Sequence, residues 1–193
     1  GLRRIGALVP RGPFGASVVK TLRNAAIAAG MEVTRIREYG KSPEEIATAI
    51  RAISDYDNRR NALLKLRTDL QEREDEGSRS ALERLDILET LGPVQFDALL
   101  VAASGSDLVN AAAQLGNYDI DTKRTRILGT SDWAAESTGR EPSLVGAWFA
   151  TPPIDATSEF SVRFRDVFGT VPPAIASSAY DLIALAAILG SRD

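Results

Sequence analysis

Apolar and polar positions at the start of the chain follow a strand–helix–strand order. Residues 5–9 form a short apolar run that predicts a buried strand, and residues 11–15 are a breaker cluster rich in glycine and proline. Apolar residues then recur at helical spacing over 16–29, Gly30 favours a helix end, and residues 33–39 alternate with one slip. This order is the repeating unit of a parallel sheet.

The next segment, 43–91, has the pattern of helices without a strand. Ser42 is a good N-cap, Pro43 suits the first helical position, and Glu45 stands three residues past the cap. Two leucine stripes follow, separated by an acid-rich stretch that indicates a solvated turn. We therefore predict an almost wholly helical insertion that projects from the sheet, with its tip near residues 72–78.

The α/β pattern returns after this insertion. Apolar runs at 98–103, 126–129 and 144–150 predict three more strands, and helical periodicity recurs between strands and over 158–168 and 174–189. Strands that alternate with helices indicate the α/β class. We expect a mostly parallel, doubly wound sheet with helices on both faces.

Composition narrows the chemistry. The chain has 193 residues, of which 44% are apolar, a net charge of −3, and no His or Cys. The charge argues against a nucleic-acid partner, and the two missing residue types exclude imidazole and thiol catalysis and the usual zinc sites. No apolar run in the sequence is long enough to span a membrane. We predict no cofactor and no bound metal.

Two enzyme signatures fail in detail. The stretch from Gly12 to Thr21 is similar to a phosphate-binding loop, but Lys20 follows Val19 rather than glycine and lies about one turn into the predicted helix. No G-x-G-x-x-G follows a predicted strand. A Rossmann-like enzyme is therefore the least favoured hypothesis. The glycines before residue 16 are interpreted as a strand-to-helix turn that needs backbone room.

Candidate binding residues lie at the predicted strand ends, because open parallel sheets bind ligands outside the carboxyl ends of their strands. The candidates are an aromatic residue, two hydroxyls, an acid and a tryptophan: Phe14, Ser104, Ser106, Asp132 and Trp133. A competing interpretation needs no ligand, since Ser104 and Ser106 also suit helix caps and Trp133 suits a packed aromatic. Capping and packing are the favoured interpretation on the residues alone.

A charged run at residues 55–60 allows two interpretations. Its carboxylates are of a type that binds metal ions, but Asp55 and Arg59 are also spaced for an ion pair on one helix face. We favour the ion pair. No pair of carboxylates in the sequence is spaced for acid–base catalysis.

Two groups of residues carry a family resemblance. The chain opens with Arg4-Ile5-Gly6-Ala7-Leu8-Val9-Pro10 and then Phe14-Gly15, and it closes with Phe160-x3-Phe164-x3-Phe168-Gly169-x2-Pro172 and Ala179-Tyr180-Asp181. These pieces resemble the second lobe of type I periplasmic-binding proteins, the leucine/isoleucine/valine-binding superfamily. A narrower set comprises Ile53-Ser54-Asp55-Tyr56-Asp57, the helical insertion, Phe96-Asp97-Ala98-Leu99-Leu100, Leu128-Gly129-Thr130 and Leu144-Val145-Gly146-Ala147-Trp148. It resembles the penicillin-binding protein activators of alphaproteobacteria.

The resemblance implies a domain plan and a location. Residues 1–150 would be the second lobe, with the insertion at 43–91, and residues 151–193 would be a hinge and helices that return toward a first lobe. The resemblance also implies an outer-membrane lipoprotein that faces the periplasm, with a lipid anchor upstream of this chain as its membrane contact. Its partner would be a peptidoglycan synthase, that is, a penicillin-binding protein.

The resemblance bears on the candidate site as well. Transport members of the superfamily hold an amino acid between two lobes, with an aromatic residue matched by Phe14 and an acid that contacts the ligand amine. The nearest acid here is Asp132, about one residue out of register. This shift and the added helical length favour a non-enzymatic activator that acts through protein contact. The alternative is a solute-binding receptor of an ABC transporter, which would hold an amino-acid-like ligand through the five candidate residues.

Overall fold

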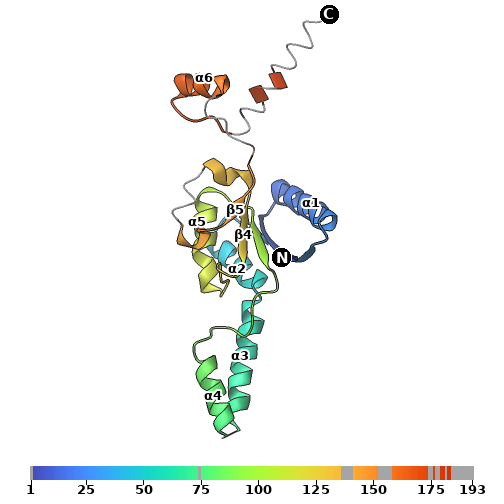
Figure 1. The fold of residues 1–193 in the computed structure, drawn as a ribbon, viewed down its shortest axis with the longest axis vertical. Helices are drawn as coiled ribbons and strands as arrows, with labels where there is room; N and C mark the ends of the chain where they lie inside the picture. The colour runs from blue at the N-terminus through green and yellow to red at the C-terminus, as the bar shows by residue number, and fades with distance from the viewer. Residues whose placement is uncertain are drawn as a thin grey trace, which may run out of the picture. The chain divides into compact units, whose positions relative to one another are not determined.

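The computed structural model describes residues 2–73, 75–135, 141–151, 158–173, 176, 179–180 and 182–183. The chain divides into two compact units, Gly1–Phe149 and Ala150–Asp193. The first unit contains a sheet and an attached helical pair (Figure 1). Among the helices that the described residues form, none combines the length and apolar character needed to cross a bilayer.

Five parallel strands form one sheet in the first unit, in the order β2-β1-β3-β4-β5. Their bounds are Arg4–Pro10 (β1), Glu32–Tyr39 (β2), Ala98–Val101 (β3), Arg126–Gly129 (β4) and Trp148–Phe149 (β5). Three consecutive β1 residues, Ala7, Leu8 and Val9, are fully buried, as expected for a strand covered on both faces. The predicted α/β class with a mostly parallel sheet is confirmed.

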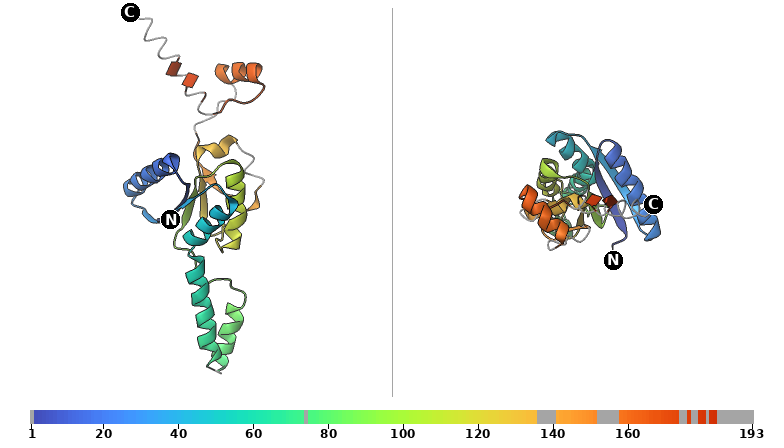
Figure 2. Two further views of the ribbon diagram at one scale, coloured as in Figure 1. Left: turned by 180° about the vertical axis from the view of Figure 1, so that it is seen from behind. Right: turned by 90° about the horizontal axis from the view of Figure 1, so that it is seen from above.

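Helices cover both faces of this sheet (Figure 2). On one face, α1 (Pro13–Ala28) packs against β1 and β2, and on the other lie α2 (Pro43–Ile53) and α5 (Gly105–Asn117). The larger hydrophobic core lies on the α2–α5 side and includes Leu8, Ile46, Ile50, Leu99, Leu108 and Trp133. The smaller core, under α1, consists of Ala7, Val9 and Ala102.

The slip in the alternation of β2 is a β-bulge. β1 pairs Ile5 with Val33 but Gly6 with Arg35, so Thr34 is the extra residue. The Thr34 hydroxyl donates to the Ile5 carbonyl oxygen at 3.4 Å. The bulge therefore reverses the alternation of the residues that follow it.

Helix α2 begins as the sequence predicts but does not project. The Ser42 hydroxyl accepts from the Glu45 backbone N–H, and the Glu45 carboxylate accepts from the Ser42 N–H, which is a capping box. The apolar stripe of α2 is fully buried: Ile46, Ile50 and Ile53. The prediction that all of 43–91 projects is therefore wrong for α2, because this isoleucine stripe packs on the sheet.

The rest of the segment forms the predicted helical hairpin, α3 (Tyr56–Gln71) and α4 (Glu76–Leu85). Figure 1 shows the pair extending away from the sheet. The Asp75 carboxylate caps α4 by accepting from the Ser78 N–H at 2.7 Å. Residues 86–91 are not helical, which corrects the predicted extent of the insertion.

The strand predicted at 144–150 is much shorter than expected. Pro142–Leu144 forms a single 3₁₀ turn (η3) instead, and Gly146 then adopts a φ of 81°. Of the described residues in this run, Trp148 and Phe149 pair with β4. Proline and glycine thus interrupt a run whose apolar residues alone favoured a strand.

The second unit contains α6 (Glu159–Phe168), as the amphipathic pattern predicts. The Ser158 hydroxyl caps its first turn, and Gly169 ends it with a φ of 70°. Its aromatic rings contact one another in a row: Phe160, Phe164 and Phe168. Most of the predicted hinge at 151–153 and of the predicted helix at 174–189 lies outside the described residues.

Candidate functional site

The carboxyl ends of β1 and β3 meet where the strand order reverses. From β1 the chain continues through α1 to β2 on one side, whereas β3 lies on the other side of β1. Ligands of open α/β sheets bind beyond the carboxyl ends of the strands at such a reversal. The loops after β1, β3 and β4, which carry the five sequence candidates, all leave the sheet at this end.

The loop after β1 is a tight strand-to-helix turn. Gly12 has a φ of 122°, and a Cβ at Gly15 would overlap the Pro10 carbonyl oxygen, so both positions require glycine, as the sequence predicts. The N-terminus of α1 has no side-chain cap, which leaves N–H groups of its first turn for other acceptors. Phe14 lies in this turn and is 53% exposed.

The loop after β3 presents two exposed hydroxyls. Ser104 occupies the N-cap position of α5, but its side chain makes no cap hydrogen bond. Gly105 has a left-handed φ of 56°, so the regular geometry of a serine cap is not formed. Ser106 lies in the first turn of α5 and is also exposed. The capping interpretation was therefore right about the position of Ser104 and wrong about its bond.

The loop after β4 holds an exposed acid. Asp132 stands in a short 3₁₀ helix, η1 (Ser131–Ala135), and its carboxylate accepts from the Thr130 hydroxyl at 3.4 Å. This bond uses one of the acceptor sites of the carboxylate, and the residue is exposed. Asp132 can therefore accept further hydrogen bonds from a cationic group.

Trp133, by contrast, is a core residue with 1% of its surface exposed. Its Nε1 donates to the Ala103 carbonyl oxygen at 2.9 Å, and its ring lies over Gly129, where a Cβ would overlap the indole. Trp133 therefore has the environment of the favoured packed-aromatic interpretation, and its burial leaves it little surface for a ligand contact. Trp133 joins the ends of β3 and β4, and so positions the loops that carry Ser104 and Asp132.

Tyr39 at the same end was not predicted as a site residue. Its hydroxyl donates to the Ala102 carbonyl oxygen at 2.9 Å and so ties the end of β2 to the end of β3. Burial, and then the negative charge of Asp107, raise the pKa of Tyr39 to about 12, so the hydroxyl stays protonated. In the sequence, this structural role of Tyr39 is indicated only by the alternating pattern of β2, whose last buried position is a tyrosine.

The expected ion pair between Asp55 and Arg59 does not form. Asp55 starts α3 with a left-handed φ of 58° and pairs with Arg35 at 3.2 Å. Arg59 pairs with Asp119 at 2.8 Å and donates to the Gly92 carbonyl oxygen at 2.7 Å. Burial lowers the pKa of the Arg59 guanidinium, and Asp119 opposes this. These contacts anchor the hairpin to the sheet.

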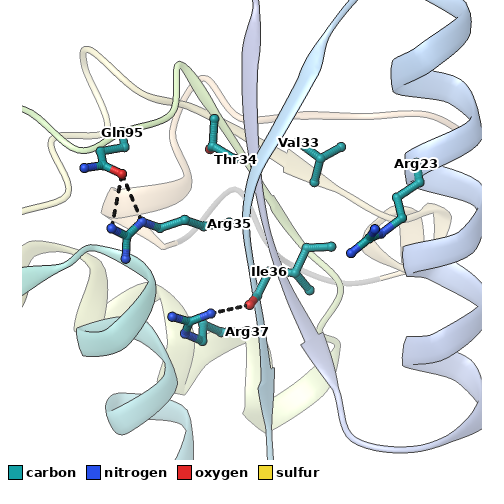
Figure 3. Close-up of a pocket in the computed structure, with 7 residues that line it drawn as sticks. All are labelled: Arg23, Val33, Thr34, Arg35, Ile36, Arg37 and Gln95. Carbon is teal, nitrogen blue, oxygen red and sulfur yellow. Dashed lines mark hydrogen bonds between the residues drawn. The ribbon is translucent and has the colours of Figure 1, made fainter.

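Two pockets lie away from the carboxyl end. One, of about 460 Å³, runs along β2 and is lined by Arg23, Arg35, Arg37 and Gln95 together with strand residues (Figure 3). The other, of about 310 Å³, lies beside Arg59 at the base of the hairpin. No group of three or more acidic side chains in the described part of the chain is placed to hold a metal ion.

Comparisons by sequence give no relative: no protein-family model matches the chain, and no curated protein matches it significantly. Solved structures do match. An ABC transporter substrate-binding protein from Desulfitobacterium hafniense is 14% identical, with a TM-score of 0.52 over 96% of this chain and 43% of that protein. An extracellular ligand-binding receptor from Verminephrobacter eiseniae is 13% identical, with a TM-score of 0.50 over 89% of this chain and 40% of that protein.

The likeness shows the fold, which is that of a lobe of the type I periplasmic binding proteins. The neighbours are binding proteins rather than enzymes. This chain spans about two fifths of their length, 43% and 40% respectively.

Proposed function

We propose that this chain forms one wall of the ligand site in a periplasmic solute-binding protein of the ABC transporter type. The observation that carries the proposal is the carboxyl end of the sheet, where exposed contact groups stand on three loops: Phe14, Ser104, Ser106 and Asp132. The fold, shared with a substrate-binding protein and a ligand-binding receptor, supports the same role.

The exposed groups suit a small amino-acid-like ligand. N–H groups in the uncapped first turn of α1 can donate to a carboxylate, which the dipole of that helix also favours. Asp132 can accept from an ammonium group, and Phe14 offers an apolar surface. Binding of this kind makes and breaks no covalent bond, so it needs no catalytic base.

A ligand clamp needs a second wall. We assign that wall to a further lobe. We assign to residues 151–193 the connection toward that lobe. The ligand titration is therefore made on the natural polypeptide that contains this sequence.

Calorimetry against a panel of amino acids tests the proposal. We expect micromolar binding of at least one, and a loss of at least tenfold in affinity for Asp132→Asn, because the amine loses a charged acceptor. Asp69→Asn, which removes an exposed acid from α3, is the matched control and should bind normally. Affinities no tighter than about millimolar for the whole panel would refute the proposal.

A second candidate function is the stimulation of a peptidoglycan synthase by protein contact, with the protein tethered to the outer membrane. One observation favours it: the hairpin extends from the sheet and exposes Leu64, and the segment that follows α4 exposes Ile87 and Leu88, which a solute clamp does not need. A hairpin deletion that abolishes synthase stimulation and leaves the fold intact would support this candidate. Unchanged stimulation would exclude the hairpin as the contact.

A further inference from the structure

Strand β2 is an open edge of the sheet. It is the longest strand, with eight residues, and no described strand pairs with its outer side. Long open edges pair readily with other strands, and proteins commonly protect them with charged side chains. Here Arg37 Nη1 donates to the Ile36 carbonyl oxygen at 2.8 Å, so a guanidinium of the strand occupies one of its own backbone acceptors.

The pocket along this edge is lined by cationic side chains, although β2 also carries Glu32 and Glu38. The pocket of about 460 Å³ that runs along it is lined by Arg23, Arg35 and Arg37 and by no acidic residue. Arg35 already pairs with Asp55 at 3.2 Å. Arg23 and Arg37 are exposed and form no ion pair with any residue that the structure describes. Within the described part of the chain these two guanidinium groups thus form no ion pair, and Arg37 also lines a second pocket with Glu38, Glu44 and Glu45.

These arginines stand on both sides of the strand. Figure 3 shows Arg23 reaching from α1 on one side of β2, and Arg35 and Arg37 on the other side, near Gln95. Side chains of a strand added to β2 would alternate between the same two faces. A strand with acidic residues at adjacent positions can therefore bring one carboxylate to Arg23 and another to Arg37.

We infer that the β2 edge binds an extended acidic segment of a partner protein by strand addition. Backbone hydrogen bonds along β2 hold the segment, and charge-assisted bonds to Arg23 and Arg37 select acidic sequences. The Arg37 guanidinium leaves the Ile36 carbonyl oxygen and pairs with the incoming carboxylate. This inference is independent of the proposed solute site, which uses other loops.

A second copy of this chain does not fit the same edge. Antiparallel pairing of two β2 strands about Arg35 sets Arg35 opposite Arg35 and Glu32 opposite Glu38, so charges of like sign meet. The arginines therefore disfavour self-pairing and leave the edge to a partner of opposite charge.

Peptide binding to the 193-residue chain tests the inference. The probe is a blocked, fluorescein-labelled peptide, Glu-Glu-Val-Thr-Glu-Glu-Val-Thr, and fluorescence anisotropy is measured at low and at high salt. We expect saturable binding that weakens with salt, and a loss of about tenfold in affinity for Arg23→Glu and for Arg37→Glu. Arg84→Glu, the same charge change on exposed α4, should change the affinity less than about twofold. Thermal unfolding of each variant confirms that it is folded.

Two control peptides separate strand addition from simple charge attraction. A lysine-for-glutamate peptide should not bind. An acidic peptide that is N-methylated at alternate residues should bind at least about tenfold more weakly, because it cannot complete the backbone ladder. Equal binding of the methylated peptide, no effect of Arg23→Glu and Arg37→Glu, or no binding by the wild type would overturn the inference. A further outcome would also overturn it: the Arg37→Ala variant self-associates, and the wild type binds no acidic peptide. The arginines would then serve only to prevent the edge from pairing with another copy.

Discussion

Helices α2 and α3 follow each other directly but have opposite environments. Four of the eleven residues of α2 are buried: Ile46, Ala49, Ile50 and Ile53. Only two of the sixteen residues of α3 are buried, Arg59 and Leu63. The α2 stripe packs on the sheet and on α5, whereas the main contacts of α3 are with α4 and the end of α2. The sequence shows helical periodicity for both helices. The residue types on the apolar face, rather than the periodicity, therefore decide whether a helix packs into the core.

The contact between the two regions is largely polar, together with one edge-on aromatic contact between Tyr56 and Tyr118. At the base of the hairpin, the Arg59 guanidinium donates to the carbonyl oxygens of Ser54 and Gly92 and pairs with Asp119, whose carboxylate also accepts from the Thr90 hydroxyl. A single arginine thus satisfies backbone acceptors on both sides of the junction. The contacts that attach the hairpin to the rest of the unit are therefore concentrated at its base, and along most of its length α3 and α4 contact mainly each other.

The largest effect is expected for truncation of the α2 stripe. Ile50→Ala should lower the free energy of unfolding by about 3 kcal/mol, because it opens a cavity in the main core. Leu64→Ala, on the exposed side of α3, is the matched control and should cost less than about 0.5 kcal/mol. Urea unfolding measures both. Equal losses would break the comparison, since α3 would then belong to the core.

Loss of the anchor comes next. Arg59→Ala should cost about 2 kcal/mol, because the carbonyl oxygens of Ser54 and Gly92 and the Asp119 carboxylate lose a charged donor. Arg60→Ala is the control, because Arg60 is exposed and donates a hydrogen bond to the Tyr56 hydroxyl at the protein surface. Indistinguishable urea midpoints for the two variants would show that the anchor is dispensable.

A pH series distinguishes the charges of the two regions. In the sheet, hydrogen bonds from Arg4 and from the Arg3 and Arg4 backbone N–H groups hold the pKa of the Asp97 carboxyl far below its ordinary value. A lowered pKa in the folded state stabilises the protein above the unfolded pKa of about 4, and this contribution is lost as the pH falls below it. Asp97→Asn should therefore cost about 1 kcal/mol near pH 7 and progressively less between about pH 4 and pH 2.

Asp86→Asn is the hairpin counterpart for this pH series. Its carboxylate lies 3.8 Å from Arg67 and is 72% exposed, so its removal should leave the urea midpoint unchanged at every pH. A pH-independent loss for Asp97→Asn would contradict the assignment of that stabilisation to the ionised carboxylate.

The smallest effect on the sheet is expected for removal of the outer hairpin. Deletion of residues 61–88, with a short Gly–Ser closure, keeps Arg59 and its partners. We expect cooperative unfolding with a free energy within about 1 kcal/mol of the parent, since loop length enters the closure entropy only logarithmically. Circular dichroism should lose helical signal. Non-cooperative unfolding of this variant would show that the hairpin is part of the core.

Local patterns predicted the parts of the molecule that local physics controls. The capping box at Ser42, the helix end at Gly30 and the turn at Gly12 each follow from a few adjacent residues. The sequence does not predict the order of the strands in the sheet. The alternation of buried apolar runs with helices does predict the fold class. The exposed positions of Phe14 and Asp132 also followed, because loops after strands are solvated.

The errors arose where a distant residue or a single turn outweighed the local pattern. Arg59 forms its ion pair with Asp119 rather than with Asp55, which is nearer in the sequence. Residue spacing along a helix cannot predict an ion pair between residues so far apart in the sequence. The apolar run at 144–150 predicted a strand, but Pro142 and Gly146 turn the backbone. Trp133 occurs in a loop by sequence, and only the approach of Gly129 and Ala103 makes a buried slot for its indole.

The double pairing of β1 has a consequence for the rate of folding. Ile5 pairs with Val33 through a short connection and with Ala98 through a long one, and the second pairing must close the larger loop. The α3–α4 hairpin lies wholly inside that loop and is held mostly by contacts between neighbouring helices. Helices of this kind form in about a microsecond, faster than long-range strand pairing. A hairpin that is already formed shortens the flexible chain between β1 and β3, so the sheet can assemble at nearly the speed of a protein without the insertion.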